Sequence, residues 1–249
     1  MEEDLSVLSR KANAPDEVIT YGEHQDQIAD IRYARVDHSR PLLVLIHGGF
    51  WKPEYDREHT EAMSSALSEL GWTVLTLEYR RIPGQPDLLV QDIAAALREL
   101  PTKVKKHDGR VILIGHSAGG HLALWAATQN LDVHAVLALA PAADLQLADS
   151  LNLGENAVRR FLGTEPASRP DLDPMMLAVP KANVMILQGK ADEIVPPSVP
   201  LAYKSRFPAV SYEEIDECGH FALIDPQTQA WQSVVDTLNQ LSESSDVTL

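Results

Sequence analysis

Five short runs of consecutive apolar residues, separated by longer amphipathic stretches, are the feature that most constrains how this 249-residue chain can fold. A strand that is apolar on both faces must be covered on both faces, as in a parallel sheet between layers of helices. Alternation of strand and helix therefore predicts a doubly wound, mostly parallel α/β sheet. The five predicted strands are residues 42–46, 73–77, 111–114, 135–139 and 184–187.

Weaker patterns complete the predicted sheet and its helices. An alternating run at 28–36 predicts an antiparallel edge strand, and 210–215 predicts the last strand. Residues 144–181 are too long for a simple connection. We interpret them as a small cap, with a short helix at 155–162, inserted into a single domain of residues 1–249. Apolar residues at helical spacing predict helices over 58–70, 87–100, 118–128, 198–206 and 227–241. The polar tail after residue 241 is expected to fray.

The charge balance disfavours some partners. The chain has 36 acidic and 21 basic residues, a net charge of −15, although a solvated acidic surface also accounts for this excess. Nucleic acid and anionic membranes are repelled by such a charge. One cysteine, Cys218, allows no internal disulfide, and neither a basic, apolar leader nor a membrane-length apolar run is seen. We expect a cytoplasmic protein with a small-molecule substrate and without nucleic-acid or membrane partners; a homodimer stays open.

A serine lies where one predicted strand gives way to a helix. Residues 115–119, Gly-His-Ser-Ala-Gly, match the G-x-S-x-G pattern in the strand–helix context that the pattern requires. The sharp turn predicts that Ser117 is held above the sheet edge as a nucleophile, with Gly115 and Gly119 letting the chain cross closely. A helix N-terminus favours negative charge, so the N–H of Ala118 is a candidate oxyanion donor. The alternative is a chance match in which glycine only eases the bend.

A second glycine-containing loop follows the first apolar strand. Residues 47–51 read His-Gly-Gly-Phe-Trp, and glycine allows the backbone to turn sharply with its N–H groups pointing outward. Donors aimed at a developing alkoxide are usually the largest catalytic contribution. We therefore predict that the N–H groups of Gly49 and Phe50 join Ala118 in an oxyanion hole. His47 is expected to fix this loop by hydrogen bonds, and an ordinary Gly-Gly turn is the alternative.

A serine nucleophile requires a base, and the base requires a carboxylate that orients it. His220 follows the last predicted strand, and Asp192 follows the strand at 184–187, so both are expected at the edge that carries Ser117. Glu193 is the local rival of Asp192. The chain order Ser, Asp, His is the order that this type of fold requires. The alternatives are a helix-capping role for Asp192 and an ordinary loop position for His220.

The remaining candidates are assigned by context. His116 is expected to point away from the nucleophile, and His121 to pack in the core or beside its helix. The other histidines, His24, His38, His59, His107 and His134, are expected to lie at the surface. No pattern typical of a metal or phosphate site is present, and we expect no cofactor. Five side chains are candidates either for an apolar acyl or aryl pocket or for the core: Phe50, Trp51, Met175, Met176 and Phe221.

With these motifs together, the chain resembles the α/β-hydrolase superfamily over almost its whole length. The 47–51 loop and the stretch Gly-His-Ser-Ala-Gly-Gly-His-Leu-Ala at 115–123 resemble a small esterase and arylformamidase group. That group includes kynurenine formamidases, which carry an HGGxW loop and hydrolyse N-formylkynurenine. Glu-Tyr-Arg-Arg at 78–81 fits the group's Tyr-Arg, and the Tyr-Gly at 21–22 with the Asp-Ile at 30–31 is similar to its early strand region. Phe50 stands where many hormone-sensitive-lipase-like esterases have a third glycine.

The resemblance implies an α/β-hydrolase fold and a serine hydrolase. It would cleave a carboxylic ester or aryl formamide through a Ser117–His220–Asp192 triad and an acyl-enzyme. A general short-chain carboxylesterase is the nearest alternative, because it needs only the serine turn and an open cleft. A catalytically inactive binding protein on the same fold is the alternative of another class.

Overall fold

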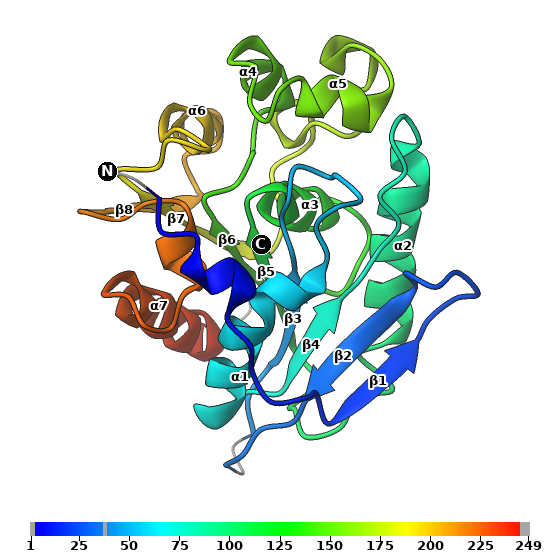
Figure 1. Cartoon of the computed structure of the whole chain (residues 1–249), viewed down its shortest axis with the longest axis vertical. Coiled ribbons are helices and arrows are strands. Elements are labelled where there is room, and N and C mark those ends of the chain that lie inside the picture. Colours follow the sequence, from blue (N-terminus) through cyan, green and yellow to red (C-terminus); the bar gives the residue numbers. More distant parts are fainter. Residues whose placement is uncertain (1–2, 37–38, 245–249) are drawn as a thin grey trace.

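The computed structural model describes residues 3–36 and 39–244, which are built around one eight-stranded sheet (Figure 1). Its strand order is β1-β2-β4-β3-β5-β6-β7-β8. The β1–β2 and β2–β4 pairs are antiparallel and all the others are parallel, which confirms the predicted fold class. The strands are β1 Glu17–Thr20, β2 Ile28–Arg32, β3 Leu42–Ile46, β4 Val74–Leu77, β5 Val111–His116, β6 Ala135–Leu139, β7 Asn183–Gly189 and β8 Ser211–Ile215.

Helices cover both faces of the sheet (Figure 1). Side chains of α2, α3 and α6 share one hydrophobic core with one face, and those of α1 and α7 share a second core with the other. The α-helices are α1 Glu61–Glu69, α2 Pro86–Glu99, α3 Ala118–Ala126, α4 Leu145–Ser150, α5 Ala157–Leu162, α6 Ser198–Arg206 and α7 Ala230–Glu243. Short 3₁₀ helices are η1 Ser6–Ser9, η2 Arg57–Thr60, η3 Pro166–Ser168, η4 Pro174–Met176 and η5 Phe221–Ile224. Within the described ranges, no helix has the length and apolarity needed to cross a membrane.

The structure differs from the sequence prediction mainly at the edge of the sheet and in the segment before β7. The strand predicted at 28–36 ends at Arg32, because its partner β4 begins opposite that residue and the next N–H, of Tyr33, donates to Asp16 instead. β1 was not predicted, since three of its four residues are exposed and carry no apolar alternation. α4 was also not predicted: its six residues are too few to show a period, and the Asp144 side chain caps it by accepting from Leu147 N at 2.8 Å.

The segment between β6 and β7 contains α4, α5, η3 and η4, which lie together beyond the strands in Figure 1. One close approach of this segment to the rest of the chain joins two glycines: a Cβ on Gly163 would lie 2.8 Å from Gly84 Cα. The N–H of Gly84 also donates to the carbonyl of Arg160 at 2.8 Å. The short helix predicted at 155–162 is present as α5. The cap function of 144–181 and the domain boundaries at 1–249 stay predictions, and most of the tail predicted to fray lies outside the described residues.

Candidate active site

Ser117 occupies a strained turn between β5 and α3. Its backbone has φ 57° and ψ −119°, a combination that a non-glycine residue rarely adopts and that costs on the order of 1–3 kcal/mol. The turn is held because Ser117 N donates to the carbonyl of Leu139 at 2.9 Å. A Cβ on Gly115 would overlap the Gly119 carbonyl, and a Cβ on Gly119 would overlap the carbonyl of Ile46. The predicted need for glycine on both sides of the serine is therefore confirmed.

The 47–51 loop lies directly against this turn. A Cβ on Gly48 would lie 2.7 Å from the carbonyl of His116 and 3.0 Å from Ser117 Cβ. The next three residues all have left-handed backbones, with φ of 104° at Gly49, 53° at Phe50 and 54° at Trp51. Ala118 is the first residue of α3, a position whose N–H has no partner within its helix. The structure thus brings the loop and the helix start together beside Ser117, and the donor roles stay a prediction.

His47 fixes the start of the loop, as predicted. Its Nδ1 lies 2.8 Å from the Gly48 carbonyl and its Nε2 lies 3.1 Å from Glu78 Oε1. Its ring stacks on Tyr79, whose hydroxyl donates to the His47 carbonyl at 2.7 Å. Burial opposes the charge of Glu78, but hydrogen bonding to His47 and the nearby Arg81 charge hold the pKa of this carboxyl at about 2. The loop therefore rests on a buried, ionised carboxylate.

Trp51 ties the other end of the loop to α3 and α5. Its ring is 3% exposed and stacks on Phe161 of α5, with centroids 4.8 Å apart. Its indole N–H donates to Nδ1 of His121 at 3.2 Å, and the Nε2 of His121 lies 2.8 Å from the carbonyl of Leu172. Of the two interpretations of Trp51, packing beneath the loop is the one that the structure shows. The predicted helix packing of His121 is confirmed.

The predicted acid and base are in contact. His220 Nδ1 lies 2.7 Å from Asp192 Oδ2, and both side chains are buried. The other oxygen, Oδ1, accepts N–H bonds from Ile194 at 2.9 Å and Val195 at 2.8 Å, so Asp192 also caps its own turn. Its rival Glu193 is exposed. Gln188, which sequence reasoning missed, donates to Asp192 Oδ2 at 3.1 Å; its place at the end of β7 was the available signal.

His116, the residue directly before Ser117, contacts His220. The His116 ring lies 4.5 Å from the His220 ring, centroid to centroid, and its Nε2 lies 3.1 Å from the His220 carbonyl. Among the described residues, the hydrogen bonds do not include one between Ser117 Oγ and His220. Such a bond is commonly long in a free enzyme and shortens in the substrate complex. The structure brings together the His220–Asp192 pair and the serine turn, and the catalytic roles of these three residues stay a prediction.

Two further side chains near the site are those of His59 and Cys218. His59 was predicted at the surface, but that prediction is wrong: it is 9% exposed and its ring meets the His47 ring edge-on at 5.6 Å. Burial lowers the pKa of His59 to about 4. His38 lies outside the described residues. Burial also raises the pKa of Cys218 to about 12, so this thiol is no rival nucleophile.

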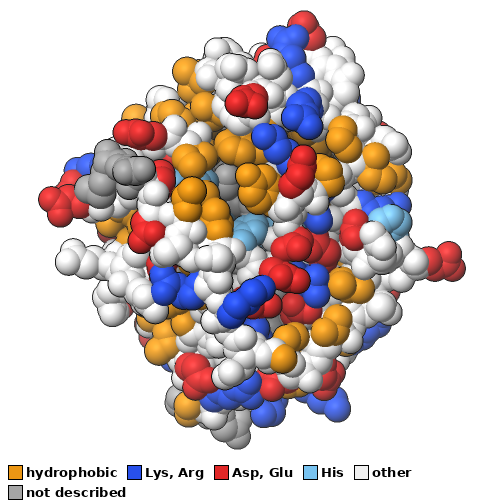
Figure 2. Space-filling view, viewed as in Figure 1, with side chains coloured by type: hydrophobic (Ala, Val, Ile, Leu, Met, Phe, Trp, Pro, Cys, Tyr) orange, Lys and Arg blue, Asp and Glu red, His pale blue; other side chains and the backbone are white. Residues whose placement is uncertain are grey.

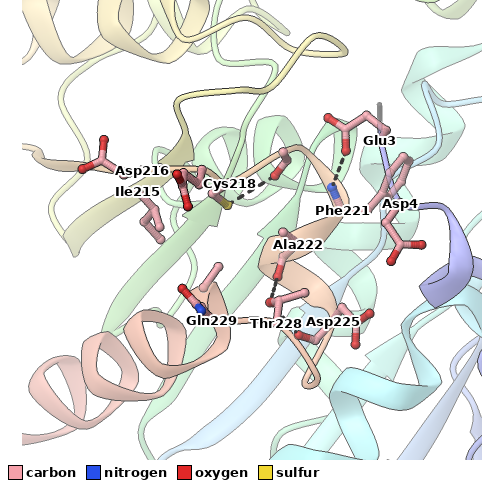
Figure 3. A pocket seen from close by; sticks show the side chains of 13 residues that line it. Glu3, Asp4, Ile215, Asp216, Cys218, Phe221, Ala222, Asp225, Thr228 and Gln229 are labelled. Atoms are coloured by element: carbon pink, nitrogen blue, oxygen red, sulfur yellow. Dashed lines mark hydrogen bonds between the residues drawn. The ribbon is translucent and has the colours of Figure 1, made fainter. Parts of the chain in front are cut away.

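The candidate pocket residues differ in exposure, and their binding role stays a prediction. Phe50, Met175 and Phe221 are half-buried, whereas Met176 exposes 53% of its surface. Hydrophobic side chains gather below α4 around a shallow hollow on the face shown in Figure 2. A separate cleft of about 570 Å³ lies behind the His220 loop, and Phe221 is the one candidate that lines it (Figure 3). The described part of the chain contains no cluster of His, Cys, Asp or Glu that could hold a metal ion.

Known proteins are similar to this chain over most of its length. The BD-FAE family model matches residues 30–205. An acetyl-hydrolase of Streptomyces hygroscopicus is 30% identical over 235 residues, and a kynurenine formamidase of Danio rerio is 24% identical over 228; both alignments cover 83% of this chain and 75% of the relative. The probable carboxylic ester hydrolase LipM of Mycobacterium tuberculosis is 30% identical over 42% of this chain, which spans only 28% of LipM.

A solved structure agrees with the fold. Esterase B of Lactobacillus rhamnosis, inhibited by a tributyrin phosphonate, superposes with a TM-score of 0.75 and 22% identity, over 93% of this chain and 88% of that one. The sheet order and the strained serine turn are those expected of an α/β-hydrolase, and the family model matches a span of 176 residues, 30–205. The chain therefore belongs to the BD-FAE family of α/β-hydrolase esterases.

Proposed function

We propose that this hydrolase is a carboxylesterase that uses Ser117 as nucleophile, His220 as general base and Asp192 as the acid that orients the base. The observation that carries the proposal is the buried 2.7 Å contact between His220 and Asp192, on a loop that touches His116 next to the strained serine. Burial keeps this pair out of water, and in the proposed relay Nδ1 of His220 holds Asp192 while Nε2 serves Ser117. A carboxylate on Nδ1 stabilises the imidazolium that forms during attack.

The proposed reaction has two steps, acylation of Ser117 and hydrolysis of the acyl-enzyme. Ser117 Oγ bonds to the substrate carbonyl carbon while His220 Nε2 takes the hydroxyl proton, and the carbonyl oxygen becomes an oxyanion. The N–H groups of Ala118, Gly49 and Phe50 are its proposed donors, each worth about 3 kcal/mol in systems of this kind. The carbon–oxygen bond to the leaving alcohol then breaks, and the alcohol departs with the proton from His220. Water repeats the sequence on the acyl-enzyme and releases the acid.

An ester is the favoured substrate, and an aryl formamide is the second candidate. The relative with the higher identity over 83% of the chain is an acetyl-hydrolase, which points to short acyl groups. The observation in favour of a formamide is the His-Gly-Gly-Phe-Trp loop, together with the 24% identity to a kynurenine formamidase. Half-buried Phe50, Met175 and Phe221 offer apolar contacts to either substrate.

A comparison of substrates tests the proposal. We would measure kcat/KM for p-nitrophenyl acetate, p-nitrophenyl butyrate and N-formylkynurenine, since the ratio of these constants reports differential binding in the transition state. We expect turnover of the acetate to exceed that of the formamide. The reverse order would identify an arylformamidase.

The nucleophile has its own control. Ser117→Ala should abolish turnover and labelling by a fluorophosphonate, while the melting temperature stays at or above that of the wild type because the strained position is retained. Retained turnover in this variant would contradict the assignment of Ser117. A folded wild-type protein that neither turns over esters nor takes the label would instead be a binding protein on a hydrolase fold.

A further inference from the structure

Glu3 lies against the loop that carries His220. Its Oε1 accepts the backbone N–H of His220 at 2.7 Å, and its Oε2 lies 3.5 Å from the backbone N of Phe221. Figure 3 shows the Glu3 carboxylate directed at the Phe221 nitrogen, beside the cleft behind the loop. This carboxylate, on the third residue of the sequence, is thus bonded to the backbone of the proposed base. No pattern in the sequence pointed to this contact.

The position of His220 explains why a distant carboxylate is needed. His220 is the N-cap of η5, and the first N–H groups of a helix have no partner within it. The side chain of an N-cap residue usually accepts one of these N–H groups. The His220 ring makes no such bond, because its Nδ1 is taken by Asp192. Glu3 accepts instead from the N–H groups of His220 itself and of Phe221, two of the first N–H groups that have no partner within this short helix.

Glu3 is placed by contacts that do not depend on its carboxylate. We call residues 3–10 the N-terminal arm. Val7 of this arm is 1% exposed and belongs to the same core as Leu223 and Ile224 of η5. Arg10 forms an ion pair with Asp225, directly after η5, at 2.7 Å. The arm is thus anchored to η5 and to the residue that follows it, and Glu3 reaches the opposite end of the same short helix.

The absence of a side chain at Gly219 leaves space for the Glu3 carboxylate. A Cβ at this position would lie 2.6 Å from Glu3 Oε2 and 2.8 Å from Glu3 Oε1, closer than real Cβ contacts come. The glycine before His220 therefore allows the close approach, and a side chain there would displace Glu3 without altering it. This offers a second, independent way to break the same contact.

We propose that Glu3 is a positioning residue for the catalytic base: its carboxylate fixes the His220 backbone, so that the imidazole reaches Asp192 and Ser117 together. The inference rests on the proposed function, because only there is His220 a base. Glu3 acts through the backbone of His220 and is assigned no contact with the reacting atoms. Its removal should therefore lower kcat and leave KM nearly unchanged.

Glu3→Ala and Glu3→Gln test the proposal against a matched control, Asp4→Asn. Asp4 lines the same cleft, but its exposed carboxylate accepts from Ser6 N, at 2.9 Å, and among the described residues it has no hydrogen bond to the His220 loop. Two readouts are needed: hydrogen–deuterium exchange of the amides at 218–224, and kcat and KM on p-nitrophenyl acetate. In Glu3→Ala we expect the His220 amide to exchange about five-fold faster or more, in line with loss of a helix cap. We expect kcat to fall about three- to ten-fold. Glu3→Gln should recover most of both, because its amide oxygen still accepts, and Asp4→Asn should change neither.

Gly219→Ala provides the second arm of the experiment. It should reproduce the faster exchange and lower kcat of Glu3→Ala, and the double variant should be no worse than either single one, because one contact is lost only once. Unchanged His220 exchange in Glu3→Ala, or faster exchange with unchanged kcat, would overturn the positioning role. If substitutions of Ser117 and His220 left ester turnover unchanged, the proposed function would fail. The hydrogen–deuterium exchange of the His220 amide does not depend on that outcome, so the two failures are distinguishable.

Discussion

At the scale of single residues, Asp192 shows how one carboxylate serves two purposes. One oxygen closes its own turn through the N–H groups of Ile194 and Val195, and the other faces His220. Asp192→Asn should keep the turn, because the amide oxygen can still accept, and should present its NH₂ to the ring and favour the wrong tautomer. We expect kcat to drop by about 10⁴-fold with the melting temperature little changed.

The measurement is steady-state turnover of p-nitrophenyl acetate together with thermal unfolding. Glu193→Gln is the matched control, because this exposed neighbour lies one position further along the same loop. The control should keep wild-type turnover. A variant Asp192→Asn with more than a tenth of the wild-type kcat would show that the base is oriented by another group.

Glu78 is the residue whose charge supports the 47–51 loop, so its loss should appear in the free energy of unfolding. A pKa of about 2, against an ordinary value of 4.5, corresponds to about 3 kcal/mol of folding free energy at neutral pH. Because the folded pKa is depressed, this contribution is complete above pH 4.5 and is lost as the pH falls toward 2. Glu78→Gln should therefore unfold at lower urea than the wild type at pH 7, with the difference narrowing below pH 4.5.

Urea unfolding at pH 7 and at pH 3.5 checks this prediction. Glu69→Gln, an exposed carboxylate near the end of α1, serves as the control and should give a difference of a few tenths of a kcal/mol at both pH values. A pH-independent gap for Glu78→Gln would mean that packing, and not charge, is what the carboxylate contributes.

At the scale of elements, the contact between Trp51 and Phe161 couples the 47–51 loop to α5. Phe161→Ala should cost about 3 kcal/mol of stability through the cavity it leaves, and it should also free Trp51 from its stacking partner. We expect kcat to fall about ten-fold as the left-handed backbone at Phe50 and Trp51 loses its support. Leu162→Ala, a buried neighbour in the same helix, is the control for lost stability. Equal kcat losses in both variants would contradict a specific role of the ring contact.

The elements differ in how well the sequence predicts them, for physical reasons. The central strands are apolar on both faces, so Leu42–Ile46 and Ala135–Leu139 have the predicted bounds. An edge strand such as Glu17–Thr20 carries no such signal, because water replaces a covering layer. The start of α1 shifts from residue 58 to Glu61, since Asp56 caps a 3₁₀ turn first by accepting from Glu58 N.

The residues of the site also differ in how well the sequence predicts them. The positions of Ser117, Asp192 and His220 after their strands follow from the rule that parallel strands carry ligands at their carboxyl ends, and the acid–base contact agrees with it. Gln188 and Glu3 act through contacts with other loops, and only the folded chain reveals those contacts. The burial of His59 likewise depends on how η2 packs beside His47, which no local pattern predicts. Periodicity reports what a segment buries, and not which distant partner it meets.

At the scale of the whole molecule, buried neutral histidine makes folding sensitive to mild acid. The pKa of His59 is about 4 when folded, against 6.5 ordinarily, because burial disfavours its charge. The unfolded chain therefore binds the extra proton first, and stability declines as the pH falls from 6.5 toward 4. At pH 5 this one residue should lower the free energy of unfolding by about 2 kcal/mol relative to pH 7.5.

Urea unfolding of the wild type and of His59→Gln at pH 7.5 and pH 5 measures the contribution of His59 to the pH dependence of the free energy of unfolding. The variant should lose about 2 kcal/mol less than the wild type between pH 7.5 and pH 5, whatever its absolute stability. His24→Gln is the control, because that histidine is exposed. An identical pH dependence in His59→Gln and the wild type would show that the ring is not buried neutral in the folded protein.

The bond between Glu3 and His220 closes a loop of 217 positions, and Arg10 and Asp225 close another of 215. Pairings this remote are among the slowest to form when a chain refolds from denaturant. Secondary structure should therefore return before ester turnover does, and the lag between the circular-dichroism signal and regained catalysis measures how slowly the N-terminal arm docks onto η5.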